Sequence, residues 1–340
     1  MTGRERVLRC LEFDRPDRVP RDLWTLPIAE IEHGPEAVAE LHERWPSDIV
    51  RCPVGQQRQP PVVRGERYGR GVYHDEWGCV FDNLMEGVIG EVKHPIIESP
   101  DDLSNLRPPV ELLDLDQQAI GGFCEQTDRF VITDAIARPW ERLQFLRGSE
   151  NAYMDLAEES AALGSLLDRI HAFNCERMQA WAATAVDGLW FMDDWGSQQA
   201  LLIDPQQWRR LFKPMYGDYA RIAPAAGKKI LMHSDGHIGT IYEDLVEIGI
   251  DAINSHLFCM DIEQLGRRFA GRITFWGEID RQAILPDPDP QRARDAVRRV
   301  VEALYRPEGG VIAQCEFGPA ARAENIDAVF AAWQQVTDEP

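Results

Sequence analysis

The chain has 340 residues and a formal net charge of −21, from 36 Lys and Arg against 57 Asp and Glu. This acidic balance argues against nucleic acid and anionic membranes as partners, because such a surface repels phosphate groups. Hydrophobic residues make up 44%, which is enough for a sizeable core. No stretch approaches the ~18 apolar residues of a membrane span, and the N-terminal residues do not form a signal-peptide core.

Seven cysteines are scattered along the chain, and no two form a Cys-x-x-Cys pair. An odd, dispersed set of this kind is typical of free thiols in a reducing compartment rather than of a disulfide framework. We therefore expect a cytoplasmic protein.

Short apolar runs alternate with longer helical patterns along most of the chain. Eight runs are predicted strands: 18–24, 48–53, 130–137, 188–193, 229–234, 251–256, 273–277 and 311–315. Helical patterns cover 36–45, 151–184, 205–223, 290–305 and 325–336, two of them starting with an Asp-Pro pair typical of a capped helix. Alternation of this kind predicts a parallel sheet. Eight units in about 340 residues favour a single (β/α)8 TIM-type barrel domain over residues 1–340.

Residues 54–128 do not follow the alternation. They contain a hairpin pattern at 72–81 and then a Pro-rich stretch. We expect an inserted excursion that acts as a lid, because long excursions from compact domains are often functional. Within it, Asp75 and Glu76 are expected to be solvated, and Trp77 is a candidate for binding substrate unless it is an ordinary buried aromatic.

Ligand-type side chains gather where the predicted strands end. They are Asp193, Asp194, His233, Asp235, His256, Glu278 and Cys315. The active site of a (β/α)8 barrel lies at this end of the strands. Ionisable groups are costly to cluster unless they are used, so this density indicates a functional site.

His233 and Asp235 are two residues apart, and on a strand such residues point to the same side. Together with Cys315 on the closing strand they make a zinc-binding set with an open fourth position. Glu278 is a candidate fourth ligand or general base. The alternatives are a His-x-Asp pair that orients a loop and a Cys that serves as a small buried hydrophobe.

The remaining candidate site residues can also be explained by a purely structural role. Asp193 and Asp194 either cap the following loop or contact substrate. Trp195 and His256 are candidates for substrate binding, although core packing explains such residues as well.

The motifs together resemble the uroporphyrinogen decarboxylase superfamily. The resemblance rests on the opening segment at 3–20, Asp194-Trp-Gly, the segment 202–214, His233-Ser-Asp-Gly, Phe275-Trp-Gly-Glu-Ile-Asp280, and the ending from Cys315 to Glu324-Asn325. It implies a (β/α)8 barrel. It also implies one of two activities, the decarboxylation of haem synthesis or cobamide-dependent methyl transfer with a zinc-bound thiolate.

The decarboxylase branch carries an Arg-Gln-Ala-Gly-Arg-Tyr segment, whose arginines bind the substrate carboxylates. Here the corresponding region reads Pro20-Arg-Asp-Leu-Trp-Thr-Leu26, and Cys315 stands where that branch has a His nine residues before the Glu of Glu-Asn. Asp48, in Pro46-Ser-Asp-Ile-Val50, echoes that branch's Phe-Ser-Asp-Ile-Leu strand. A decarboxylase of tetrapyrrole or other carboxylate substrates, with Asp48 and Arg21 in its pocket, is therefore the second hypothesis.

The methyltransferase branch binds zinc with a His-x-Cys pair and a distal Cys, and Asp235 stands in place of the first Cys. A His233, Asp235 and Cys315 zinc ion would be a stronger Lewis acid than one with two thiolates. The leading hypothesis is methyl transfer between a small substrate and a cobamide, with Glu278 shuttling a proton and Asp193 and Asp194 contacting substrate or the His.

The cobamide would sit on a separate corrinoid protein, because the chain has no Asp-x-His-x-x-Gly motif. A third hypothesis is a non-catalytic barrel that binds a cobamide or a tetrapyrrole. The oligomeric state is left open, a homodimer included.

Overall fold

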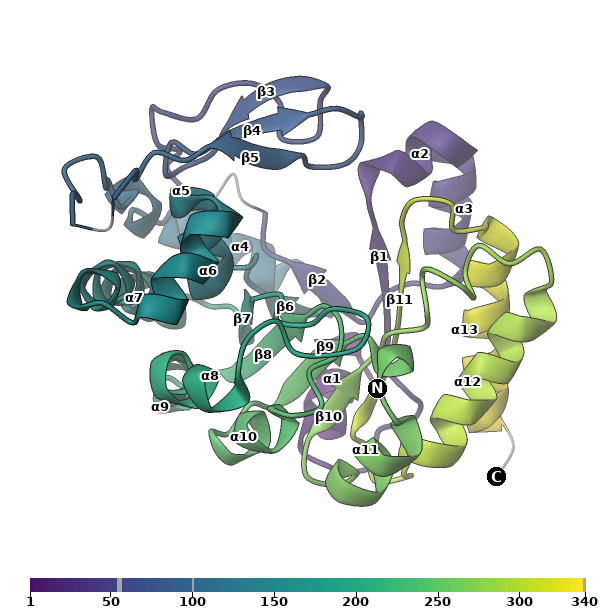
Figure 1. The fold of residues 1–340 in the computed structure, drawn as a ribbon. Helices are drawn as coiled ribbons and strands as arrows, with labels where there is room; N and C mark the ends of the chain where they lie inside the picture. Colours follow the sequence, from purple (N-terminus) through teal and green to yellow (C-terminus); the bar gives the residue numbers. More distant parts are fainter. Residues whose placement is uncertain (54–56, 100, 339–340) are drawn as a thin grey trace.

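Eight parallel strands form one sheet in the order β1–β11–β10–β9–β8–β7–β6–β2 (Figure 1). The computed structural model describes residues 1–53, 57–99 and 101–338. The strands are β1 (Arg21–Thr25), β2 (Ile49–Arg51), β6 (Phe130–Ile132), β7 (Gly188–Met192), β8 (Lys229–Ser234), β9 (Ala252–Ser255), β10 (Thr274–Trp276) and β11 (Val311–Phe317). Asp48 N–H donates to Arg21 O at 2.8 Å and links the two ends of the sheet. The predicted TIM-type barrel is confirmed. Each predicted run overlaps one of these strands, and β1 and β11 extend past the predicted ends at 24 and 315.

Helices surround the barrel and connect successive strands. They are α1 (Gly3–Leu11), α2 (Pro27–His33), α3 (Pro35–Arg44), α4 (Gln117–Glu125), α5 (Pro139–Arg147), α6 (Ser149–Glu158), α7 (Ala161–Ala182), α8 (Pro205–Leu211), α9 (Lys213–Ala225), α10 (Tyr242–Glu247), α11 (Ile262–Phe269), α12 (Pro290–Leu304) and α13 (Ala323–Asp338), with short 3-10 turns at Val110–Leu113 and Leu257–Cys259. None of them, over the described residues, is long and apolar enough to cross a membrane.

Two of the predicted helical stretches are divided. The stretch 151–184 breaks between α6 and α7, where Glu159 has a left-handed backbone (φ 45°) and the Ser160 side chain accepts from Leu163 N. The stretch 205–223 breaks at Phe212, between α8 and α9. The predicted cap at Asp204 is present, because its carboxylate accepts from Gln206 N.

Three tryptophans fill the barrel interior below its carboxyl end. The rings of Trp24, Trp190 and Trp276 lie 5.3–6.1 Å apart. The indole N–H groups of Trp24 and Trp276 donate to Asp22 Oδ2 at 2.7 and 2.9 Å. The Arg51 guanidinium lies 4.8 and 4.4 Å from the rings of Trp24 and Trp190. This layer closes the barrel interior, and its Trp24 ring contacts His233 above it at 5.5 Å.

The excursion forms a three-stranded antiparallel sheet of β3 (Gly71–His74), β4 (Val80–Asn83) and β5 (Glu91–His94), above α5 in Figure 1. Arg142 of α5 forms ion pairs with Asp75 and Glu76 in the hairpin turn. Asp75 is only 3% exposed, so the expectation that it is solvated is wrong. The reason is that Arg142 is a buried charge partner of Asp75. The two residues are far apart in the sequence, so their pairing could not be predicted from it.

On its other side the excursion touches α2. A Cβ added at Gly87 would lie 2.7 Å from Ile28 N, so the two backbones approach closely. Because α2 and α5 follow the carboxyl ends of β1 and β6, the excursion extends across this end of the barrel.

Candidate functional site

Two histidines and three carboxylates meet at the carboxyl ends of β7 to β10. His233 Nε2 lies 3.1 Å from Asp235 Oδ1 and 3.4 Å from Asp194 Oδ1. His256 Nε2 lies 2.8 Å from the same Asp235 oxygen and 3.5 Å from Glu278 Oε1. We call these five residues the rim cluster. The sequence predicted all five as site residues, and the structure brings them together.

Glycines let the loops that carry the rim cluster come together. A Cβ on Gly196 would lie 2.2 Å from His237 N, and one on Gly236 would lie 2.1 Å from Gly196 O. Gly236 also has a φ of +74°, where L side chains are strained. The loops after β7 and β8 therefore need both glycines, and Asp194 Oδ1 then accepts from Asp235 N–H at 2.9 Å.

Hydrogen bonding fixes which nitrogen of His233 is available. Asn254 Nδ2–H donates to Trp276 O, so the Asn254 oxygen faces His233. That oxygen lies 2.5 Å from His233 Nδ1, which must carry the proton. Burial lowers the pKa of the His233 ring, but the hydrogen bonds and charges of Asp194 and Asp235 outweigh it and raise the pKa well above its usual value. In the metal-free protein Nε2 therefore faces the two carboxylates as an N–H, and a bound metal ion would displace this proton. This is the arrangement by which a hydrogen-bonded partner orients a metal-binding histidine.

His256 is held in the opposite tautomer. Gly236 N–H donates to His256 Nδ1 at 3.2 Å, so a proton on this ring resides on Nε2. That nitrogen faces Asp235 and Glu278. His256 is therefore placed to hold a proton at the rim cluster rather than to bind a metal through Nε2.

Both oxygens of Glu278 are buried without a hydrogen-bond partner among the described residues. Asp235 Oδ1 and His256 Nε2 are buried as well and face each other at 2.8 Å. Burial raises the pKa of Glu278 to about 7, although Arg281 and His256 oppose the rise. Arg281 also pairs with Asp235 and, at 3.0 Å, with Glu316. Buried polar atoms without partners are costly, so this cluster is suited to a ligand or an ion.

Among the residues that the structure describes, three groups of side chains have the spacing of metal ligands. Two belong to the rim cluster, Asp194–His233–Asp235 and Asp235–His256–Glu278. In the first, Asn254 holds His233 Nδ1 and leaves Nε2 to face the carboxylates; in the second, His256 Nδ1 accepts from Gly236 N–H, so Nε2 keeps its proton. The third group, His171, Cys175 and Asp218, lies on α7 and α9 outside the barrel and was not predicted.

Cys315 is fully buried on β11. Burial raises the pKa of its thiol well above the usual value, and the charges of Glu278, Asp22 and Glu316 add to the rise. Among the described residues Cys315 is not a member of any of the three groups. Its proximity to these carboxylates means that a thiolate here needs a nearby cation.

Asp193 and Trp195 lie beneath the rim cluster, in the core. The Asp193 carboxylate accepts from the backbone N–H groups of Trp140 and Glu141, each at 2.8 Å, and from Tyr216 OH at 2.6 Å. Trp195 is fully buried, and its indole N–H donates to the same Tyr216 OH. Both residues therefore fix the loop that carries Asp194.

Asp48 precedes β2, at the end of the barrel opposite the rim cluster. Its oxygens accept from Arg6 and Arg18 at 2.6 and 2.8 Å and from Arg21 N at 2.8 Å. These contacts hold α1 against the start of the sheet. We therefore assign Asp48 a structural role in place of the predicted substrate contact.

A cavity of about 490 Å3 lies between the excursion, α5 and α7. Trp77, a predicted substrate contact, lines it. Glu141 lines it too, and the charge of Asp194 is close enough to influence the Glu141 carboxyl, whose pKa burial raises to about 7. None of the five rim-cluster residues lines the cavity, and Glu141 lies between the two. The sequence did not predict the charged side chains that α5 and α7 contribute to this lining. The sequence of a helix does not show which residues of an inserted segment pack against it.

Residues 77–336 match the family described as uroporphyrinogen decarboxylase (URO-D). The chain belongs to this family. No curated protein matches the chain significantly.

Among solved structures, a methyltransferase from Methanosarcina mazei matches with a TM-score of 0.72, at 18% identity and over 99% of both chains. At this identity the match shows a shared fold. An IOLI protein with a bound zinc atom has a TM-score of 0.37 at 15% identity, over 68% of this chain and 84% of that one. A 7,8-dihydropteroate synthase from Vibrio fischeri has a TM-score of 0.36 at 9% identity, over 96% of both chains. These two scores are too low to support an argument.

Proposed function

We propose that this member of the URO-D family is a zinc-dependent methyltransferase that moves a methyl group between a small substrate and a cobamide on a separate corrinoid protein. The observation that carries the proposal is the orientation of His233, whose Nδ1 is held by Asn254 and whose Nε2 faces two carboxylates. The fold shared with a protein named as a methyltransferase supports it.

His233, Asp235 and Cys315 would hold the zinc ion and leave one position open. His233 Nε2 and Asp235 Oδ1, 3.1 Å apart, fit a cation. Cys315 fits less well, because it pairs with Leu23 and shares the outer face of β11 with Phe317, which packs on His33, whereas Glu316 shares the inner face with Trp24. Asp194 is the nearest further carboxylate. Since its Oδ1 already accepts from Asp235 N–H, we assign it the role of positioning Asp235.

Zinc, when bound, lowers the pKa of a coordinated acceptor atom and polarises a methyl-bearing heteroatom. The chain's own residues supply the proton handling. His256 holds a proton on Nε2 between Asp235 and Glu278. With a pKa near 7, Glu278 can take up or release that proton at neutral pH, which is the condition for efficient general acid–base catalysis. The excursion is held against α5 by the ion pairs of Arg142 with Asp75 and Glu76.

The test uses zinc-loaded protein, free methylcobalamin and a small thiol or phenol acceptor under anaerobic conditions. Transfer breaks the Co–C bond, leaves both electrons on cobalt and gives cob(I)alamin, whose absorption spectrum is distinct. We expect this change with the wild type and its loss in Cys315→Ala and Asp235→Ala. An active, zinc-replete Cys315→Ala would contradict the assignment of the thiolate.

Decarboxylation of a tetrapyrrole or other carboxylate remains the second candidate, and one observation favours it. The Arg51 guanidinium lies on the tryptophan layer at the carboxyl end of β2 and takes part in no ion pair among the described residues. Such a group can bind a substrate carboxylate. Consumption of uroporphyrinogen by metal-free protein, without any change in methylcobalamin, would favour this candidate over methyl transfer.

A further inference from the structure

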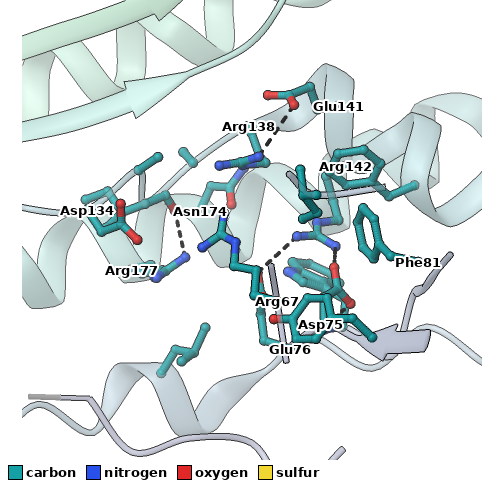
Figure 2. Close-up of a pocket in the computed structure, with 18 of the residues that line it drawn as sticks. Arg67, Asp75, Glu76, Phe81, Asp134, Arg138, Glu141, Arg142, Asn174 and Arg177 are labelled. Carbon is teal, nitrogen blue, oxygen red and sulfur yellow. Dashed lines mark hydrogen bonds and ion pairs between the residues drawn. The ribbon is translucent and has the colours of Figure 1, made fainter. Parts of the chain in front are cut away.

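The cavity beside the rim cluster has a charge arrangement that the proposed methyl transfer does not explain. Arg142 is fully engaged there with Asp75 and Glu76. Figure 2 shows Arg177 and Arg67 on the other side of the space, near Asp134 and Asn174. Within 1–53, 57–99 and 101–338, these two guanidinium groups have no ion-pair partner.

Arg177 of α7 is the central case. It is only 9% exposed, yet no carboxylate of the described residues lies within ion-pair distance of it. It donates to Ile136 O at 3.3 Å and to Gln57 Oε1 at 3.1 Å, and its Nε–H has no partner. Burial lowers the pKa of Arg177 to about 10, which still leaves the side chain positively charged at neutral pH. A buried cation without a counter-ion is costly, and the cost is offset when an anion binds.

Gln57 provides a second, independent observation. Its side chain is 5% exposed, and its Nε2 donors have no partner among the described residues while its oxygen accepts from Arg177. Both residues line the cavity. Two buried groups therefore present unused donors and no unused acceptor on this side, which is the pattern of a site for an acceptor-rich group.

The rest of the lining restricts the ligand. The aromatic side chains of Tyr73, Trp77, Phe81 and Phe145 form one wall. Four guanidinium groups and four carboxyl groups line the cavity, namely those of Arg67, Arg138, Arg142, Arg177, Asp75, Glu76, Asp134 and Glu141. Because these charges balance, a single negative charge on the ligand is enough to supply Arg177 with a counter-ion. The cavity volume of about 490 Å3 lies within the range of small-molecule sites.

We propose that Arg177 and Gln57 bind the carboxylate of a small aromatic monocarboxylic acid, with its ring against the aromatic wall. That this acid is the substrate rests on the proposed function, because Glu141 of the cavity lining donates its N–H to Asp193, the residue before Asp194 of the rim cluster. The binding of the acid does not depend on it.

The test is isothermal titration of the metal-loaded full chain with benzoate as the probe. Benzamide, which has the same ring without the charge, and inorganic phosphate are the comparison ligands. We expect benzoate to bind at least tenfold more tightly than either. Arg177→Gln should weaken benzoate binding at least tenfold, whereas Arg169→Gln, an exposed arginine of the same helix, should leave it unchanged. Equal binding of benzoate and benzamide, phosphate binding as tight as benzoate, or an unchanged Arg177→Gln would overturn the proposal.

A second variant keeps the proposal falsifiable if Arg177→Gln fails to fold. Gln57→Glu supplies the missing carboxylate partner, so we expect a higher melting temperature together with loss of benzoate binding. A variant that is less stable or still binds benzoate would contradict the reading of Arg177 as an unpaired cation. Zinc content is measured on the same samples. A variant that loses benzoate binding but retains zinc shows that this site is separate from the metal site. A wild type that binds benzoate but no zinc would contradict the proposed function and leave the benzoate site supported.

Discussion

Asn254 allows the metal site to be tested through a residue that would not touch the metal. It lies on β9, is fully buried, and connects His233 Nδ1 to Trp276 O. In Asn254→Leu the side chain keeps its approximate volume and loses the acceptor. The His233 proton is then no longer held on Nδ1 and can move to Nε2, which removes the lone pair that would bind zinc.

The expected size follows from this single contact. Loss of the hydrogen-bond partner of a metal-binding histidine costs about 10–100-fold in metal affinity, which is about 1.4–2.8 kcal/mol. A buried donor left without an acceptor costs about 1–3 kcal/mol, so the folding stability should also fall by a similar amount. In Asn254→Asp the acceptor toward His233 is kept, and we expect zinc affinity within about threefold of the wild type.

The assay is competition for zinc with a chelator, followed at constant pH. All variants carry Cys175→Ser, because the group His171, Cys175 and Asp218 on the outer helices could bind a second ion. Urea unfolding of each variant shows that it is folded. An Asn254→Leu that binds zinc as tightly as the wild type would refute the role of Asn254 and weaken the assignment of His233.

Three further predictions follow from the same geometry. Cys315→Ala should lose zinc by more than about tenfold, whereas Asp194→Asn should lose less; chelator competition ranks the two, and the reverse order would make Asp194 the ligand in place of Cys315. Burial raises the pKa of Asp22 to about 6 from the usual 3.8, so the folded state holds this proton more tightly than the unfolded state and stability falls as the pH rises through this range. Relative to Asp22→Asn, the wild type should lose about 2 kcal/mol between pH 4.5 and 7.5 in urea unfolding, and a constant difference would contradict the raised pKa. Arg142→Leu leaves Asp75 buried without its partner and should destabilise the excursion by about 3–5 kcal/mol, seen as faster proteolysis within 57–99; unchanged proteolysis would show that the ion pairs do not hold it.

The barrel was predictable because its signal is local. Each strand is a short apolar run bounded by turn residues, and the order of strands and helices leaves few other topologies. The breaks at Glu159 and Phe212 were not predictable in the same way. Pro214, in the first turn of α9, is a signal for the break at Phe212 that the helical pattern over 205–223 overrode. Glu159 has no such signal, because it adopts a left-handed backbone that its residue type does not favour.

The rim cluster was partly predictable for a related reason. In a parallel barrel the strand ends converge, so side chains at the ends of successive strands can be placed near each other without coordinates. The sequence could not show which nitrogen of His233 or His256 is free, because that depends on Asn254 and Gly236 from neighbouring strands and loops. It also could not place Arg177 beside Gln57, 120 residues away along the chain.

The metal content of anaerobically purified protein tests the central claim most directly. Wild type, His233→Ala and Cys175→Ser would be compared after zinc is supplied and unbound metal is removed. The account predicts about one zinc per chain in the wild type and in Cys175→Ser, and none in His233→Ala. A chain without zinc, or one whose zinc is lost in Cys175→Ser and retained in His233→Ala, would contradict it.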